Sequence, residues 1–283
     1  MTLAIAFPFE DNSLVLDPYF SRLLEGFSGA AAEGGYGFLL VPSSPRRSDF
    51  PLLQLLVEGR FDGAIVADPA RSDDLIPILE RHGVPVVTTG RYRDGQTVPW
   101  VDNDNRGGMV QLLEHVESSG YARPALISMS RELSFSRDIE AEFRRLAGKD
   151  APLVRTGEVT EQAGYEQAIQ LLDSDAPPDA IVTSSDRQAL GALRAAKELD
   201  ISVPQDLGIA GAGDTLASHA HPPITSLHVQ ARSLGETAIN WLLALIDGGE
   251  TPTERVLDTY VVARRSTERR ANLSVADAVS RGA

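Results

Sequence analysis

The strongest evidence for the fold is the stretch PDAIVTSSDRQALGALRAAKELDISVPQDLGIAGAGDTLASHAHPPITSL, residues 178–227. Its apolar run at 180–183 ends in the polar residues 184–186, which is typical of a strand buried on both faces. The apolar spacing over 188–199 predicts an amphipathic helix, and the run at 207–213 predicts a second strand. The stretch is therefore a βαβ unit.

The same unit occurs earlier in the chain, as FDGAIVADPARSDDLIPILERHGVPVVTTGR at 61–91. It again runs strand, Asp, helix, Val-Pro, strand, so we expect two halves that are built alike, with Asp68 and Asp186 in equivalent positions. Parallel sheets of this kind bind ligands at the carboxyl ends of their strands. In the second half those ends are 184–186, where Ser185 or Asp186 can also cap the helix, and 211–215.

Composition limits the partners of the chain. Its 283 residues, 42% of them hydrophobic, can bury a large core. The net charge is −14 and the arginine pairs are dispersed, so we expect no direct contact with DNA phosphates. There is no cysteine, which excludes disulfides and thiol chemistry.

The N-terminal residues MTLAIAFPFEDNS lack the basic start and long apolar stretch of a signal peptide, and no membrane span is expected. We therefore expect a cytoplasmic location.

No motif for catalysis or for a cofactor is present. GAG at 211–213 lacks the third glycine of GxGxxG, and neither GxxxxGK[ST], GxSxG nor HExxH occurs. His219, His221 and His228, with Asp214, lack a fixed fourth ligand for a metal. Asp102 and Asp104 are explained by turn and helix-cap roles. We expect no enzyme activity, cofactor or metal.

Apolar periodicity predicts the remaining elements in alternating order. Before the 61–91 unit we expect strands at 3–9 and 36–41 and helices at 19–32 and 51–58. After a polar segment at 99–108, where Asp104 or Asn105 is a candidate helix cap, we expect helices at 107–118, 136–147 and 162–173 and strands at 124–129 and 153–156. A helix at 231–246 and a final strand at 255–263 follow the opening stretch.

Ten short segments together resemble the effector-binding domain shared by lactose- and galactose-repressor-like transcription regulators and by periplasmic sugar-binding proteins of the ribose type. The resemblance covers roughly residues 3–267. The segments are DPYF (17–20), GGYGFLLV (34–41), FDGAIVADP (61–69), GVPVV (83–87), VDNDNRGG (101–108), GYARPALIS (120–128), SSDRQALGALRAAKEL (184–199), VPQDLGIAG (203–211), PPITSL (222–227) and VVARRST (261–267). The VPQDLGIAG and PPITSL segments favour the repressor branch.

The resemblance implies an α/β fold of the periplasmic-binding-protein-like type I, with two similar doubly wound parallel-sheet lobes. Three crossovers are expected to join the lobes, near 101–104, 227–230 and 258–261. The chain then divides into an N-terminal lobe (1–101 plus 231–258), a C-terminal lobe (104–227 plus 261–270) and a polar tail (271–283).

DNA-binding members of the family carry a helix-turn-helix ahead of the first strand, which here starts at 2–3. We therefore expect operator DNA to be bound only through a helix-turn-helix that is missing from this chain. That segment has either been removed, which we favour, or is naturally absent.

In the first lobe, the resemblance places ligand contacts at Asp17, Tyr19, Phe20, Asp68 and Arg91. The two aromatic rings offer flat faces to a sugar ring, although core positions explain them equally well. The Arg91 guanidinium can donate paired hydrogen bonds to vicinal hydroxyls or to a carboxylate.

In the second lobe, the resemblance places ligand contacts at Arg137, Ser185 and Asp214. Arg137 matches the family's principal ligand-binding arginine, the alternative being a solvated arginine at a helix start. Asp186 is interpreted as a helix cap.

The chain departs from the family pattern at Gly213, Val159 and Val229, where a carboxylate, an aromatic ring and a polar side chain are expected. With Arg91 and Arg137 kept, these departures favour a ligand with a negative group, although Asp17 and Asp68 can neutralise both arginines.

The sequence thus predicts the effector-sensing domain of a bacterial repressor-type regulator, working as a homodimer. Its small-molecule effector is expected to be a sugar, a sugar acid or a sugar phosphate. A free-standing solute-binding protein of the ribose-binding type is the alternative, and an α/β enzyme is a third.

Overall fold

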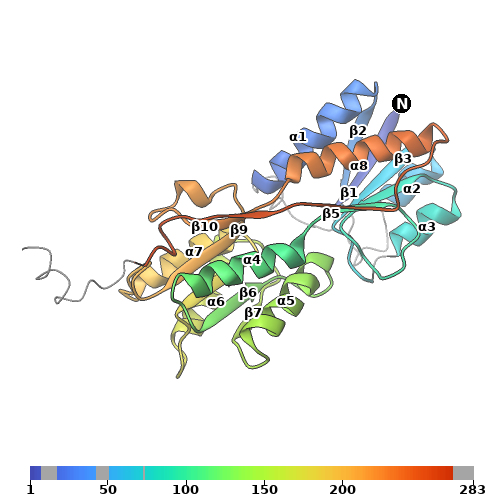
Figure 1. Ribbon diagram of the computed structural model, residues 1–283. Helices are drawn as coiled ribbons and strands as arrows, with labels where there is room; N and C mark the ends of the chain where they lie inside the picture. The colour runs from blue at the N-terminus through green and yellow to red at the C-terminus, as the bar shows by residue number, and fades with distance from the viewer. Residues whose placement is uncertain (8–17, 43–50, 73, 270–283) are drawn as a thin grey trace, which may run out of the picture.

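The computed structural model describes residues 1–7, 18–42, 51–72 and 74–269. Figure 1 shows two α/β lobes side by side, each built on one twisted sheet. The C-terminal residues of the described chain lie in the second lobe, beyond the last strand. The predicted fold class is confirmed by this arrangement of two mostly parallel sheets.

Each sheet contains six strands. In the order of the first sheet they are β11 (Glu254–Leu257), β5 (Trp100–Asn103), β4 (Val86–Thr89), β3 (Gly63–Ala67), β1 (Thr2–Phe7) and β2 (Gly37–Pro42). In the order of the second they are β12 (Tyr260–Val262), β10 (Thr225–His228), β9 (Gly208–Gly213), β8 (Ala180–Thr183), β6 (Pro124–Ser128) and β7 (Leu153–Arg155). All neighbouring strands are parallel except β10 and β12.

Helices cover both faces of each sheet. The first lobe contains α1 (Pro18–Glu33), α2 (Pro51–Val57), α3 (Leu75–Arg81) and α8 (Ala231–Ile246). The second contains α4 (Asn105–Ser118), α5 (Ser134–Ala147), α6 (Glu161–Leu172), α7 (Asp186–Glu198) and the short 3₁₀ helix η1 (Ala217–His219).

The central strands of each sheet are continuous apolar runs because they are buried on both faces. In β1, Leu3 and Ile5 pack against α1 and α8, whereas Ala4 and Ala6 face α2 and α3. This division follows from the alternation of side chains along a strand. In β6, Leu126 likewise faces α4 and α5 while its neighbours face α6 and α7. Burying one such leucine or isoleucine contributes about 1.5–3 kcal/mol.

Three crossovers join the lobes and lie side by side. They run from β5 to α4, from β10 to α8 and from β11 to β12. The backbone N–H of Gln230 donates to Asn103 Oδ1 at 2.9 Å, and its side chain donates to the Asp258 carbonyl at 2.9 Å. Thr259 Oγ1 donates to the Asp104 carbonyl at 3.1 Å. Each crossover is therefore hydrogen-bonded to at least one other.

The expected final strand at 255–263 divides into two strands, because β11 extends the first sheet and β12 the second. Asp104 caps α4, accepting the backbone N–H of Gly107 at 2.8 Å. The helices α4 and α5 each begin two residues before their expected starts. Among the described residues, no helix is long and apolar enough to span a membrane.

Candidate ligand-binding cavity

A cavity of about 160 Å³ lies between the lobes, at the carboxyl ends of strands from both sheets. Its first-lobe wall is formed by Phe7, Tyr19, Phe20, Leu23, Asp68, Asp102 and Asn103. Its second-lobe wall is formed by Asn105, Met109, Leu112, Met129, Phe135, Ile139, Val159, Thr183, Ser184, Ser185, Asp186, Arg187, Ala212, Gly213, Thr215, Leu227 and Val229. Apolar side chains make up much of both walls.

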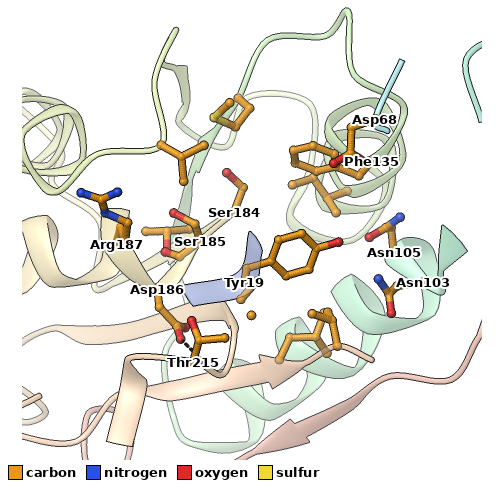
Figure 2. A pocket seen from close by; sticks show the side chains of 18 of the residues that line it. Tyr19, Asp68, Asn103, Asn105, Phe135, Ser184, Ser185, Asp186, Arg187 and Thr215 are labelled. Carbon is orange, nitrogen blue, oxygen red and sulfur yellow. Dashed lines mark hydrogen bonds between the residues drawn. The ribbon is translucent and has the colours of Figure 1, made fainter. Parts of the chain in front are cut away.

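Tyr19 and Phe20 come from the first turn of α1. The Phe20 ring meets the Phe7 ring edge to face, with 4.5 Å between their centroids, and is 5% exposed. Phe20 is thus both a core residue and part of the cavity wall. Figure 2 shows the Tyr19 ring reaching into the middle of the cavity, toward Phe135. Asp17, the neighbouring candidate, lies outside the described residues.

Asp68 follows the end of β3 and carries its carboxylate into the cavity. Its backbone has a φ of 43°, a left-handed conformation that costs about 1–2 kcal/mol for a residue with a side chain. The backbone N–H donates to the Thr89 carbonyl at 2.8 Å and holds this turn in place. No described residue donates a hydrogen bond to the carboxylate, and burial raises the pKa of Asp68 to about 7.

Asp102 in β5 is a second buried carboxyl group in the cavity wall. Burial, followed by the negative charge of Asp68, raises the pKa of Asp102 to about 7. Its Oδ1 accepts the Asn103 backbone N–H at 2.7 Å and the Asn105 amide at 3.0 Å. These two hydrogen bonds lower the pKa of Asp102 and oppose part of the increase. Two carboxyl groups that share a low-dielectric site favour the binding of hydrogen-bond donors. Sequence reasoning assigned Asp102 only to a turn.

Arg91 and Arg137 do not line the cavity. Arg91 in the first lobe lies 3.5 Å from Asp138 in the second and 3.6 Å from Asp94. Arg137 donates to the Glu132 carbonyl at 2.8 Å and to the Tyr92 carbonyl of the first lobe at 3.3 Å. Both guanidinium groups are thus engaged where the lobes touch.

The residues of α5 that do line the cavity are Phe135 and Ile139, two positions before and two positions after Arg137. Two residues correspond to about 200° around a helix, so both side chains point to the side opposite Arg137. The sequence reasoning that selected Arg137 missed Ile139, because it lacked the rotation of α5. An apolar side chain occupies this part of the wall.

These contacts form an interlobe latch on one side of the cavity. The latch also includes the Arg71 backbone N–H, which donates to the Glu132 carbonyl at 2.9 Å, and the Ser72 hydroxyl, which donates to Glu132 Oε2 at 3.2 Å. We define the latch as Arg71, Ser72, Arg91 and Tyr92 of the first lobe with Glu132, Arg137 and Asp138 of the second.

The polar residues after β8 are held by contacts within the second lobe. Ser185 caps α7, accepting the Gln188 backbone N–H at 3.2 Å, and the Ser184 hydroxyl donates to Gln188 Oε1 at 2.8 Å. The expected cap role of Asp186 is wrong, since Ser185 has that role. The expected equivalence of Asp68 and Asp186 is also wrong, because Asp68 directly follows its strand and Ser184 is its counterpart.

Asp186 organises the loop that follows β9. Its Oδ2 accepts the backbone N–H groups of Thr215, Leu216 and Ala217 at 2.7, 3.0 and 3.2 Å, and its Oδ1 accepts the Ser226 hydroxyl at 2.6 Å. The residue is 2% exposed. It holds the β9 loop against the start of α7.

Asp214 does not line the cavity. Its Oδ1 lies 2.6 Å from the Arg264 guanidinium and its Oδ2 lies 3.1 Å from His228 Nδ1. Gly213 does line the cavity and has a φ of 113°, a conformation that side chains strongly disfavour. Of the sequence-derived candidates among the described residues, the structure brings Tyr19, Phe20, Asp68 and Ser185 together in the cavity.

Two parallel-sheet lobes, three crossovers and one cavity lined by both lobes define a two-lobed ligand-binding protein. The chain belongs to the periplasmic binding protein-like domain family, whose model matches residues 113–267, more than half of the sequence.

Similar proteins include the HTH-type transcriptional regulator CelR of Thermobifida fusca. It is 29% identical over 274 residues, which span 94% of this chain and 81% of CelR. The structure of a transcriptional regulator CelR–cellobiose complex has a TM-score of 0.86 at 27% identity, covering 94% of this chain and 84% of that one. A regulatory protein of the LacI family from Chloroflexus aggregans has a TM-score of 0.79 at 25% identity, covering 94% and 98%. The predicted resemblance to repressor-type regulators is confirmed.

Proposed function

We propose that this chain is the effector-binding domain of a repressor-type transcription regulator. The carrying observation is the cavity, whose walls come from both lobes at the carboxyl ends of the strands. A ligand there touches both lobes only when they are closed, so its binding favours the closed state. The effector is a small molecule with a polar part, such as a sugar derivative, as the cellobiose complex of CelR supports.

Ligand contacts are assigned to Tyr19, Phe20 and Asp68 from the first lobe and to Asn105 and Ser185 from the second, because these line the cavity. The lobes divide the chain as 1–101 plus 231–258 and 104–227 plus 261–270, in line with the two sheets.

The regulator acts in the cytoplasm, as a homodimer, without enzymatic activity. Operator DNA is bound through a helix-turn-helix outside this sequence, as the names of the similar HTH-type regulators support. The net charge of −14 argues against a direct role of this chain in binding DNA phosphates. A free-standing solute-binding protein is not favoured, because the similar proteins are transcription regulators.

Small-angle X-ray scattering with a panel of sugars and glycosides tests the sensing function. An effector is expected to lower the radius of gyration of the chain and to stabilise it, by about 2.7 kcal/mol at a concentration 100 times its Kd. The same compound should change the operator affinity of the full-length regulator. A compound that binds without changing either the radius or the operator affinity would contradict the proposal.

A further inference from the structure

The second-lobe wall of the cavity is unsuited to a ligand that is polar all round. Ile139, Val159 and Val229 line this wall together with Met109, Met129 and Phe135. None of these side chains carries a strong hydrogen-bonding group. Sugar hydroxyls buried against them would lose their hydrogen bonds to water without replacement, which is unfavourable.

Much of the hydrogen-bonding capacity on this side of the cavity is already used within the protein. Ser184 donates to Gln188, Ser185 accepts from Gln188, and Asp186 accepts four hydrogen bonds. Figure 2 shows the Arg187 guanidinium pointing away from the centre of the cavity. Among the described residues, Nη1 of Arg187 is buried without a hydrogen-bond partner, so this arginine is the unused donor beside α7, while the serines and Asp186 are already engaged.

Free acceptors lie in the first-lobe wall of the cavity. The Asp68 carboxylate accepts no hydrogen bond from the described residues, and only Oδ1 of Asp102 is engaged by the neighbouring Asn103 and Asn105. Figure 2 places Asp68 beside Phe135, across the Tyr19 ring from Ser185. The cavity thus combines two acceptor carboxyl groups from the first lobe with a largely apolar second-lobe wall.

Building on the proposed effector-sensing function, we propose that the ligand is amphipathic, with an apolar ring against the second-lobe wall and a hydrogen-bond-donating head at Asp68 and Asp102. The volume of about 160 Å³ suits such a ring, because apolar cavities of about 150 Å³ hold benzene. The Tyr19 and Phe20 rings supply further faces for stacking. The head carries either hydroxyl groups, as in an aryl glycoside, or an ammonium group.

Calorimetry with four compounds tests the proposal: phenyl β-D-glucopyranoside, methyl β-D-glucopyranoside, 2-phenylethylamine and phenylacetate. Phenyl glucoside or phenylethylamine should bind at least about tenfold more tightly than methyl glucoside, since each buried CH₂-sized apolar group contributes to affinity. Phenylacetate should bind weakly, because its carboxylate meets two others.

Binding of methyl glucoside as tight as that of phenyl glucoside would overturn the proposal and leave the sensing function intact. The proposal would also be overturned if neither phenyl glucoside nor 2-phenylethylamine bound. The sensing function itself fails only if ligands bind without moving the lobes.

Variants of the apolar wall locate the ring. Ile139→Gln is expected to lower the affinity for phenyl glucoside or 2-phenylethylamine, whichever binds more tightly, about tenfold. The reason is that the variant buries a polar group beside the ring. Leu146→Gln is the matched control, since Leu146 lies in the same helix with 42% exposure and does not line the cavity. If Ile139→Gln does not fold, Val229→Thr makes the same test with a side chain of equal shape. If whichever of Ile139→Gln and Val229→Thr folds binds the compound with wild-type affinity, the ring does not lie against the second-lobe wall and the proposal is wrong.

Asp68→Asn separates the two kinds of head. It keeps an acceptor oxygen but removes the negative charge, so binding of an ammonium compound should fall more than tenfold while binding of a glycoside falls less. If binding of both compounds is unchanged, the head does not lie at Asp68 and the proposal is wrong.

Discussion

The guanidinium of Arg91 in the first lobe lies 3.5 Å from the carboxylate of Asp138 in the second, beside the cavity rather than within it. Asp138 also lies 2.6 Å from Arg106 of its own lobe. This contact belongs to the interlobe latch, which joins the two lobes through residues that do not line the cavity.

Asp138→Asn is expected to loosen the latch. The free energy of unfolding should fall by less than about 1 kcal/mol, because the pair is partly exposed. The radius of gyration of the ligand-free chain should increase, which scattering measures. Asp94→Asn is the control, since Asp94 contacts the same arginine from within the first lobe at 94% exposure. Equal effects of the two substitutions on the radius would contradict the latch.

The buried carboxyls predict a pH dependence of stability. Both pKa values are raised to about 7, against about 3.9 in the unfolded chain, so the folded chain keeps protons that the unfolded chain has lost. The contribution of Asp68 and Asp102 to stability therefore falls as the pH rises from about 4 to 7 and is flat above that window.

Asp68→Asn removes one of these titrations. Relative to wild type, the variant should gain about 2 kcal/mol in its free energy of unfolding between pH 5 and pH 8. Urea unfolding at both pH values measures this difference, and Asp102→Asn should show the same trend. If the free energies of unfolding of both variants differ from that of wild type by the same amount at pH 5 and at pH 8, the pKa values of Asp68 and Asp102 are not raised.

Asp186→Asn is expected to destabilise the second lobe by about 3 kcal/mol, because the new amide places donors against backbone N–H groups. Urea unfolding is the measurement. Asp206→Asn is a suitable control, since that exposed carboxylate accepts one hydrogen bond from the described residues, from the Ser202 backbone N–H at 3.2 Å. Similar losses in the two variants would show that the buried network around Asp186 contributes little.

Asp214→Asn separates stability from binding. Its carboxylate is 11% exposed and pairs with Arg264, so its loss should cost about 1–3 kcal/mol. Affinity for the better ring-bearing compound should change less than about twofold, because Asp214 does not line the cavity. Calorimetry that shows a tenfold loss of affinity at unchanged stability would instead place Asp214 in the binding site.

Much of the fold follows from the sequence because strands buried on both faces are continuous apolar runs. The run at 180–183 matches β8 in full, and Asp104 caps α4 as its spacing suggested. The same reasoning failed for 255–263, since an apolar run does not show that one strand changes sheets midway.

The site was predictable only at positions fixed by strand ends and loops. Val159, Gly213 and Val229 line the cavity as the family pattern implied. Arg137 does not, because a shift of two residues turns a helical side chain to the other face. The role of Asp186 depends on backbone N–H groups about thirty residues away, which no local pattern encodes.

The hydrogen bonds among the three crossovers limit the degrees of freedom between the lobes. A single connecting segment between two lobes would permit bending and twisting about any axis. The three crossovers, which are hydrogen-bonded to one another through Asn103, Gln230, Asp258 and Thr259, resist twisting and sliding. Opening about a single axis is therefore the motion of lowest energy. Any ligand that bridges the cavity therefore drives the same displacement, and ligands differ in how far they drive it rather than in its direction.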